Sequence, residues 1–216
     1  MRDDDSIAGF LRQLAARTAA PGAGATAALH AAQAAALIAM VARFSDGPRY
    51  DAEVIGRVRP AADALIFEAM ALAEADAMAF EAVTAAYRLP KGSPQEQRAR
   101  SRAIADALGQ ASGPPARLLT VSARIIGLAE DLLPAANRNL TGDLFAAVAS
   151  ARAATEIAWV IIEANLAGIT DPELTAELGA AVAGAAAMTG RANVLASRIH
   201  QALASGDLAD RLAFLY

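Results

Sequence analysis

The chain has 216 residues, of which 56% are hydrophobic and only 5% aromatic, and its formal net charge is −4. An acidic chain with no basic run among aromatic residues is not expected to bind nucleic acid. Cysteine is absent and the two histidines, His30 and His200, lie far apart, so neither a disulfide framework nor a metal site is expected. The N-terminus, Met1-Arg-Asp-Asp-Asp5, is acidic and no apolar core follows it, which argues against a signal peptide and favours the cytoplasm.

Turn and capping residues divide the chain into seven predicted helices, and no stretch alternates with the period of a strand. The predicted helices are 5–19, a stretch from the turn at 21–24 to about 44, 51–87, 93–108, about 115–136, about 143–166, and a last one that opens at the cap 170–173. Ser93 and Glu96 form a capping box with a proline at the first helical position. Pro60 predicts a kink or a break near the start of the third helix.

These elements predict a single all-α domain over residues 1–216, a bundle of long antiparallel helices. Two helical stretches, 31–36 and 180–187, consist almost entirely of small residues. Such helices are buried in a large bundle or in a subunit interface, so a homodimer formed through helices is expected. Residues 18–42 carry no charge and are long enough to span a bilayer, but they are mostly alanine, which favours a buried helix and no membrane contact.

One carboxylate lies on the apolar stripe of the third predicted helix. At 100° per residue, Asp76 shares a face with six apolar residues, Val58, Leu65, Ala69, Phe80, Val83 and Tyr87. A carboxylate directed into apolar surroundings is costly unless it is neutral or paired, and desolvation raises its pKa. It is therefore either part of a functional site or a buried aspartate that caps a helix or pairs with an arginine.

Three other polar features have a functional and a structural interpretation. Lys91, the only lysine, lies at a Leu-Pro-Lys corner and is either a ligand-binding cation or a surface lysine at a helix end. The turn 22–26 opens a helix whose free N–H groups could receive an anion or a carbonyl, or it is a tight turn that permits close packing. Asp143 could accept hydrogen bonds from a ligand, or it interacts only with the helix dipole.

Five sequence elements occur in an order and spacing that are specific together. They are Pro21-Gly-Ala-Gly-Ala25 leading to Met40-Val41; Asp76-Ala-Met-Ala-Phe80; Leu89-Pro-Lys91 before the capped helix; Asn137, Asn139 and Asp143; and Asn165, Leu166, Ile169 and Asp171. Through these elements the chain resembles the cyclodeaminase/cyclohydrolase family of folate enzymes. That family comprises the cyclodeaminase half of formiminotransferase-cyclodeaminase and the stand-alone bacterial methenyltetrahydrofolate cyclohydrolases.

The resemblance implies a tetrahydrofolate derivative as substrate and no cofactor beyond it. It implies methenyltetrahydrofolate cyclohydrolase or formiminotetrahydrofolate cyclodeaminase activity, with Asp76 as the general acid and base. Lys91 would be the second catalytic residue, polarising a reacting nitrogen or holding the glutamate carboxylates of the folate. The implied substrate-binding residues are Gly22, Gly24, Thr26, Asn139 and Asp143.

Several positions depart from the family pattern. Ala23 and Ala25 replace the middle glycine and the serine of the turn, Arg43 and Ile161 replace asparagines, and Gly142 replaces a serine. These are turn and polar positions of the kind that line a ligand site. They motivate an alternative, a non-catalytic helical homodimer that retains the family scaffold but not its chemistry.

Overall fold

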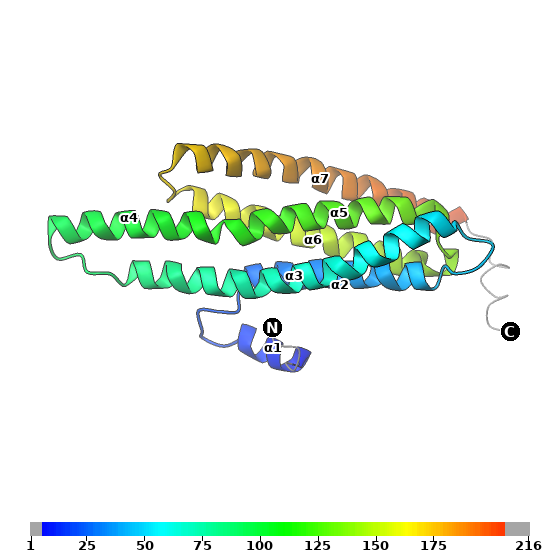
Figure 1. Cartoon of the computed structure of the whole chain (residues 1–216), viewed down its shortest axis with the longest axis horizontal. Helices are drawn as coiled ribbons and strands as arrows, with labels where there is room; N and C mark the ends of the chain where they lie inside the picture. The colour runs from blue at the N-terminus through cyan, green and yellow to red at the C-terminus, as the bar shows by residue number, and fades with distance from the viewer. Residues whose placement is uncertain (1–5, 206–216) are drawn as a thin grey trace.

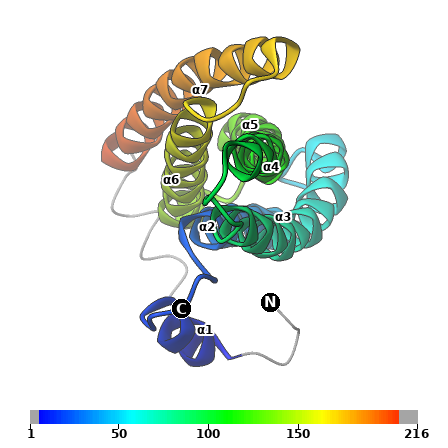
Figure 2. The same cartoon turned by 90° about the vertical axis from the view of Figure 1, so that its left-hand side faces the viewer.

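The computed structural model describes residues 6–205, which form seven α-helices and one short 3₁₀ helix and contain no strand (Figure 1). The helices are α1 (Ile7–Leu14), α2 (Ala23–Arg43), α3 (Ala52–Tyr87), α4 (Pro94–Ala111), α5 (Gly113–Ala135), η1 (Arg138–Leu140), α6 (Thr141–Leu166) and α7 (Pro172–Ser205). The prediction of an all-α fold with seven helices is confirmed. Helices α2 to α7 form a six-helix bundle, and the short α1 lies outside it (Figures 1 and 2).

Four helices surround the main core. Helix α2 packs against α3 and α6, and α5 packs against the same two helices, while α7 covers α6 (Figure 2). Along the long axis α2 and α3 run in opposite directions, as do α5 and α6, and α6 and α7 (Figure 1). The predicted antiparallel arrangement therefore holds within the described part of the chain.

Short side chains allow these helices to approach closely. Eleven of the 21 residues of α2 are buried, and nine of those eleven are alanine. Two segments, α2 and the stretch from η1 through α6, are long and apolar enough to cross a membrane by length and composition alone. In the bundle α2 is a central core helix in contact with α3, α5 and α6, which explains why it carries almost no charge.

Helix α3 is continuous through Pro60 and curves in both views, so the proline bends the helix without breaking it (Figures 1 and 2). Of the residues predicted to share a face with Asp76, Val58, Leu65 and Ala69 are fully buried. Phe80 and Tyr87 are 47% and 52% exposed, contrary to that pattern. The C-terminal part of α3 projects with α4 as a hairpin beyond the four central helices, so fewer neighbours cover it (Figure 1).

Helices α4 and α5 lie nearly in line and are separated only by Ser112 (Figure 1). The break between the fourth and fifth predicted helices is thus shorter than expected, because α4 continues to Ala111. Pro114 and Pro115 have no N–H, so the carbonyls one turn earlier lose their helical partners. Ser112 is completely buried, and its N–H and hydroxyl both donate to the carbonyl of Leu108, at 3.1 and 2.9 Å. This junction lies beside the candidate site.

Candidate active site

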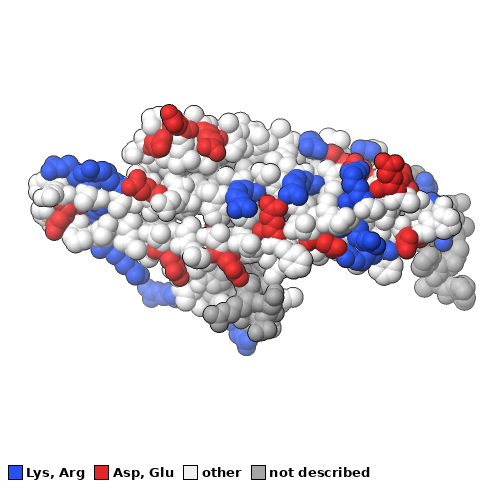
Figure 3. All heavy atoms as spheres, viewed as in Figure 1, with Lys and Arg blue, Asp and Glu red and all other residues white. Residues whose placement is uncertain are grey.

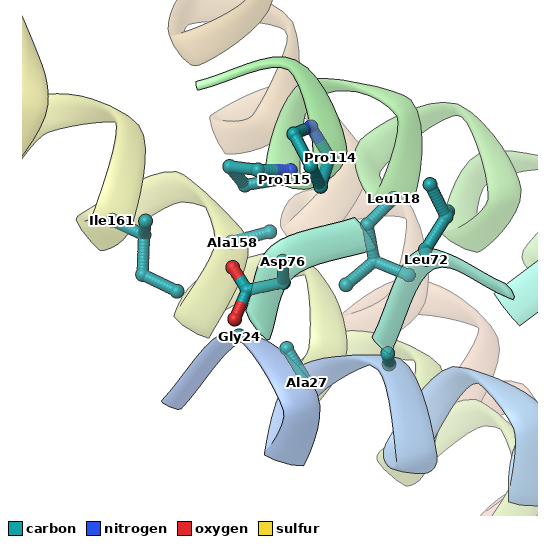
Figure 4. A pocket seen from close by; sticks show the side chains of 10 residues that line it. Gly24, Ala27, Leu72, Asp76, Pro114, Pro115, Leu118, Ala158 and Ile161 are labelled. Carbon is teal, nitrogen blue, oxygen red and sulfur yellow. The ribbon is translucent and has the colours of Figure 1, made fainter. Parts of the chain in front are cut away.

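The carboxylate of Asp76 lies directly over Gly24. Figure 4 shows the side chain leaving α3 toward the start of α2, with Pro115 of α5 and Ile161 of α6 around it. A Cβ on Gly24 would overlap the carboxylate carbon and both oxygens. Glycine is therefore required at position 24 for the two helices to approach at this point, which is the close packing that the sequence offered as one interpretation of the turn.

Burial and one hydrogen bond shift the pKa of Asp76 in opposite directions. The side chain is partly buried among apolar residues, and this desolvation raises the pKa of the carboxyl above its ordinary value. The backbone N–H of Ala25 donates to the carboxylate and partly offsets that effect. No ion pair to Asp76 occurs among the described residues. The alternative in which an arginine neutralises Asp76 is therefore not observed, whereas the bond from Ala25, in the first turn of α2, is the cap on a neighbouring helix that the sequence offered as the other structural interpretation. The capped carboxyl still has a raised pKa.

A cavity of about 230 Å³ opens beside this carboxylate. Its walls come from the turn before α2, from α3, from the end of α4 and from the C-terminal part of α6. The lining residues are Ala19, Ala20, Gly22, Ala23, Gly24, Asp76, Phe80, Val83, Ala111, Ile161, Ala164 and Asn165. Mostly apolar walls with a few polar groups are typical of small-molecule sites. The predicted first helix ends at Leu14, five residues early, and residues 19 and 20 instead form part of this wall.

Asp76 and Asn165 are the two lining side chains that carry polar atoms. The sequence offered Asn165 only as part of a family element and gave it no role. The amide nitrogen of Asn165 donates to Oγ of Ser112 at 3.3 Å. Asn165 lies 89 positions after Asp76, and no short-range pattern in the sequence links the two residues; only the packing of α6 beside α3 reveals the relation.

The structure places two of the predicted substrate-binding residues, Gly22 and Gly24, in the cavity wall. Gly22 is the N-cap of α2, and an added Cβ there would meet no atom within 4 Å. The hydroxyl of Thr26 donates to the carbonyl of Gly22 at 3.0 Å, so this side chain stabilises the first turn of α2 and is not part of the cavity wall.

Lys91, Asn139 and Asp143 lie away from this cavity within one chain. Lys91 is exposed at the corner that follows the end of α3. At 1.5 Å per residue, that end of the helix is about 16 Å from Asp76. Asp143 is in the first turn of α6, roughly 27 Å along the helix from Ile161. The fold of the single chain therefore brings none of these three residues next to Asp76.

The departures from the family pattern fall into two groups. Ala23 and Ile161 line the cavity, and Ala25 supplies the N–H that binds Asp76, so these three bear directly on the site. Arg43 is at the far end of α2, where it forms an ion pair with Asp63 at 2.7 Å. Its replacement of an asparagine therefore does not alter this cavity.

The fold and site define an α-helical protein with one desolvated carboxyl at the mouth of a small apolar cavity. Residues 6–190 match the family described as formiminotransferase-cyclodeaminase, and the chain belongs to this family. The crystal structure of formiminotetrahydrofolate cyclodeaminase from Thermotoga maritima superposes with a TM-score of 0.80 at 24% identity, covering 92% of this chain and 97% of that one. This likeness shows that the fold is shared.

Two relatives are similar in sequence over most of the chain. The methenyltetrahydrofolate cyclohydrolase of Methylorubrum extorquens is 33% identical over 174 residues, which is 79% of this chain and 84% of that protein. The formimidoyltransferase-cyclodeaminase of Mus musculus is 33% identical over 171 residues. That match covers 78% of this chain but only 32% of the mouse protein, so the chain spans about a third of the two-activity relative.

Proposed function

We propose that this protein is a methenyltetrahydrofolate cyclohydrolase in which Asp76 acts as general acid and base. The observation that carries the proposal is the partly buried carboxyl of Asp76, seated on Gly24 and open to a cavity of about 230 Å³. The match to a cyclohydrolase over 84% of that relative's length supports this activity in particular.

The reaction adds water to the amidinium carbon that bridges two folate nitrogens. Asp76 in its ionised form accepts a proton from the attacking water, which forms a tetrahedral centre. The protonated carboxyl then gives that proton to one bridging nitrogen as its bond to carbon breaks. The hydroxyl on that carbon releases its own proton to water at the same time, leaving a formyl group on the other nitrogen. A carboxyl with a raised pKa suits both steps, because it accepts the proton more readily than an ordinary aspartate.

The geometry gives the remaining predicted residues different roles in the proposal. Gly22 and Gly24 line the cavity at the start of α2, whose free N–H groups would face a carbonyl of the substrate. Lys91, Asn139 and Asp143 remain proposed substrate contacts. Within a homodimer, which we also propose, they would approach the cavity of the partner or the distant glutamate end of a folate. A cytoplasmic location fits the same substrate.

Formiminotetrahydrofolate cyclodeaminase activity is the second candidate. The relatives named formimidoyltransferase-cyclodeaminase favour it, since they match most of this chain. In that reaction a folate nitrogen attacks the formimino carbon and ammonia leaves. Asp76 would again move the protons, so the two candidates share the site and differ in the substrate. Release of ammonia from formiminotetrahydrofolate distinguishes them.

The decisive experiment measures the hydrolysis of methenyltetrahydrofolate by its absorbance, with the spontaneous rate subtracted. Asp76→Asn should lower the catalysed rate by about 10²- to 10⁴-fold, the usual contribution of a general acid and base. Asp106→Asn is the matched control, because Asp106 is exposed on α4 and outside the cavity. Unchanged turnover in Asp76→Asn would refute the role of Asp76.

A thermal-shift measurement with tetrahydrofolate tests the alternative of a non-catalytic scaffold. A ligand that binds only the native state stabilises it by about 2.7 kcal/mol at a concentration of 100 Kd. Stabilisation without turnover would indicate a folate-binding protein that has lost the chemistry. Neither stabilisation nor turnover of either substrate would favour the scaffold alternative.

A further inference from the structure

We infer that Asn165 is a specificity-determining residue that accepts a hydrogen bond from an N–H of the substrate, and that Ser112 fixes its orientation; this rests on the proposed function. Asn165 extends from α6 and lines the cavity on a different wall from Asp76, which extends from α3. Since the other lining side chains are apolar or absent, these two are the polar side chains of the wall that can orient a ligand, beside the backbone N–H groups at the start of α2.

The hydrogen bonds around Ser112 determine which atom of Asn165 is available. A serine hydroxyl has one hydrogen, and that of Ser112 donates to the carbonyl of Leu108 at 2.9 Å. The hydroxyl can therefore only accept from Asn165, so the amide nitrogen must be the atom facing it, at 3.3 Å. The carbonyl oxygen, Oδ1, is on the other side of the amide and receives no hydrogen bond from any described residue.

The buried position of Ser112 makes this orientation stable. Ser112 is completely buried at the junction of α4 and α5, and its backbone N–H also bonds to Leu108, at 3.1 Å. A hydroxyl held in this way loses a buried hydrogen bond if it rotates to donate elsewhere. The cavity is thus equipped with a neutral acceptor at Asn165 and a titratable carboxyl at Asp76.

This pair selects a ligand that presents an N–H donor at one place and the reacting carbon at another. The aminopyrimidinone ring of a reduced folate carries several N–H donors and is the chemical class that fits. Because Asn165 is uncharged, it orients the ring without adding a second negative charge beside Asp76. A carboxylate at position 165 would disfavour ionisation of Asp76 and raise its pKa further.

The test uses three variants and the hydrolysis of methenyltetrahydrofolate, with the KM and kcat values determined separately. Asn165→Ala should raise KM by about tenfold with a smaller change in kcat, which corresponds to one lost hydrogen bond to the substrate. Ser112→Ala should raise KM in the same direction by roughly half as many logarithmic units, because the amide is retained but no longer fixed. Asn165→Asp should move the acid limb of the pH–rate profile to higher pH.

Asn193→Ala is the matched control, since Asn193 lies on α7, bonds to Arg152 at 2.7 Å and is not part of the cavity wall. A purely structural role of Asn165 would lower the melting temperature but leave KM and the pH profile unchanged, and this result would overturn the inference. Wild-type protein that neither hydrolyses methenyltetrahydrofolate nor is stabilised by tetrahydrofolate would overturn the proposed function and this inference together. Wild-type turnover with an unaffected Asn165→Ala would overturn only the inference.

Discussion

At the level of single residues, the site depends on the contact between the carboxylate of Asp76 and Gly24, which has no side chain. Gly24 leaves space for the carboxylate of Asp76, and Ala25 next to it supplies the N–H that binds this carboxylate. Apolar neighbours remove water from the rest of the group. The position and the pKa of the carboxyl therefore depend on the first turn of α2 as well as on Asp76 itself.

Gly24→Ala should displace the carboxylate. The new Cβ would overlap Asp76, whose side chain can rotate away only by giving up the N–H of Ala25. We expect turnover to fall by about 10²-fold or more, as if the acid were misplaced, and the free energy of unfolding to decrease by about 1 kcal/mol. Gly127→Ala on α5 is the control, because a Cβ there meets nothing within 4 Å and Gly127 is not part of the cavity wall. Equal effects of the two substitutions, measured by turnover and by urea denaturation, would contradict this account.

The raised pKa of Asp76 has a consequence for stability that can be measured separately from activity. A carboxyl whose pKa is higher in the folded state than in the unfolded state binds more protons when folded, so the free energy of unfolding falls as pH rises from the unfolded value through the folded one. Asp76→Asn removes this loss. The variant should therefore gain stability relative to the wild type as the pH rises above about 4, the ordinary pKa of an aspartate, and through the higher pKa of the folded state. A stability difference that does not change with pH, followed by urea denaturation, would show that the pKa is not raised.

At the level of helices, the N-terminal boundaries follow from a few capping residues that can be recognised in the sequence. The capping box at Ser93 and Glu96 is present, with the backbone N–H of Glu96 donating to Ser93 Oγ at 3.2 Å. Asp51 caps α3 and Asp171 binds the first N–H groups of α7. Local hydrogen bonds of this kind depend on neighbours in the chain, so they are readable from sequence alone.

The site was only partly predictable for a physical reason. A helical wheel places Asp76 on the inward face correctly, but it does not show where the covering helices end, and so it did not predict the exposure of Phe80 and Tyr87. The role of Asn165 depends on the packing of α6 beside the α4–α5 junction. Such contacts between distant residues are set by the tertiary arrangement and leave no periodic trace in the sequence.

Asn137 is expected to stabilise the loop before α6 and not to bind substrate. Its side chain donates to the carbonyl of Phe44 at 3.3 Å and accepts from the N–H of Asn139 at 3.1 Å, and it is nearly buried. Asn137→Ala should destabilise the fold by about 1 to 3 kcal/mol without changing KM. Asn139→Ala, at an exposed side chain, should have little effect on stability. A raised KM in Asn139→Ala, measured with methenyltetrahydrofolate, would instead support the predicted contact with substrate.

At the level of the whole molecule, the polar groups predicted to bind one ligand occupy opposite ends of a long bundle. The cavity lies beside the C-terminal part of α6, whereas Asn139 and Asp143 lie at its beginning. The exposed residues Arg88, Lys91, Arg98 and Arg102 gather at the free end of the α3–α4 hairpin, the end at which Figure 3 shows Lys and Arg side chains. We expect a second copy of the chain to bring these separate groups together.

The outer face of α3 is the surface on which we expect that second copy to pack. Phe67 and Met78 are each 72% exposed, and their positions, eleven apart along α3, place both on one face of the helix. Phe67→Glu combined with Met78→Glu should convert a dimer into a monomer at micromolar concentration, as measured by light scattering. Val194→Glu, at a residue 63% exposed on α7, should leave the dimer intact. A monomeric wild type, or dissociation caused by Val194→Glu alone, would show that α3 is not the interface.

The lone lysine has a practical consequence. Lys91 is exposed at the tip of the hairpin, and the rest of the chain carries its positive side chains as arginine and histidine. Amine-directed reagents near neutral pH would thus modify one side chain of this sequence, besides the α-amino group, and would not react with the residues that line the cavity. A fluorophore attached there would report the movement of this tip, and a short bifunctional linker would join two molecules only where their tips meet.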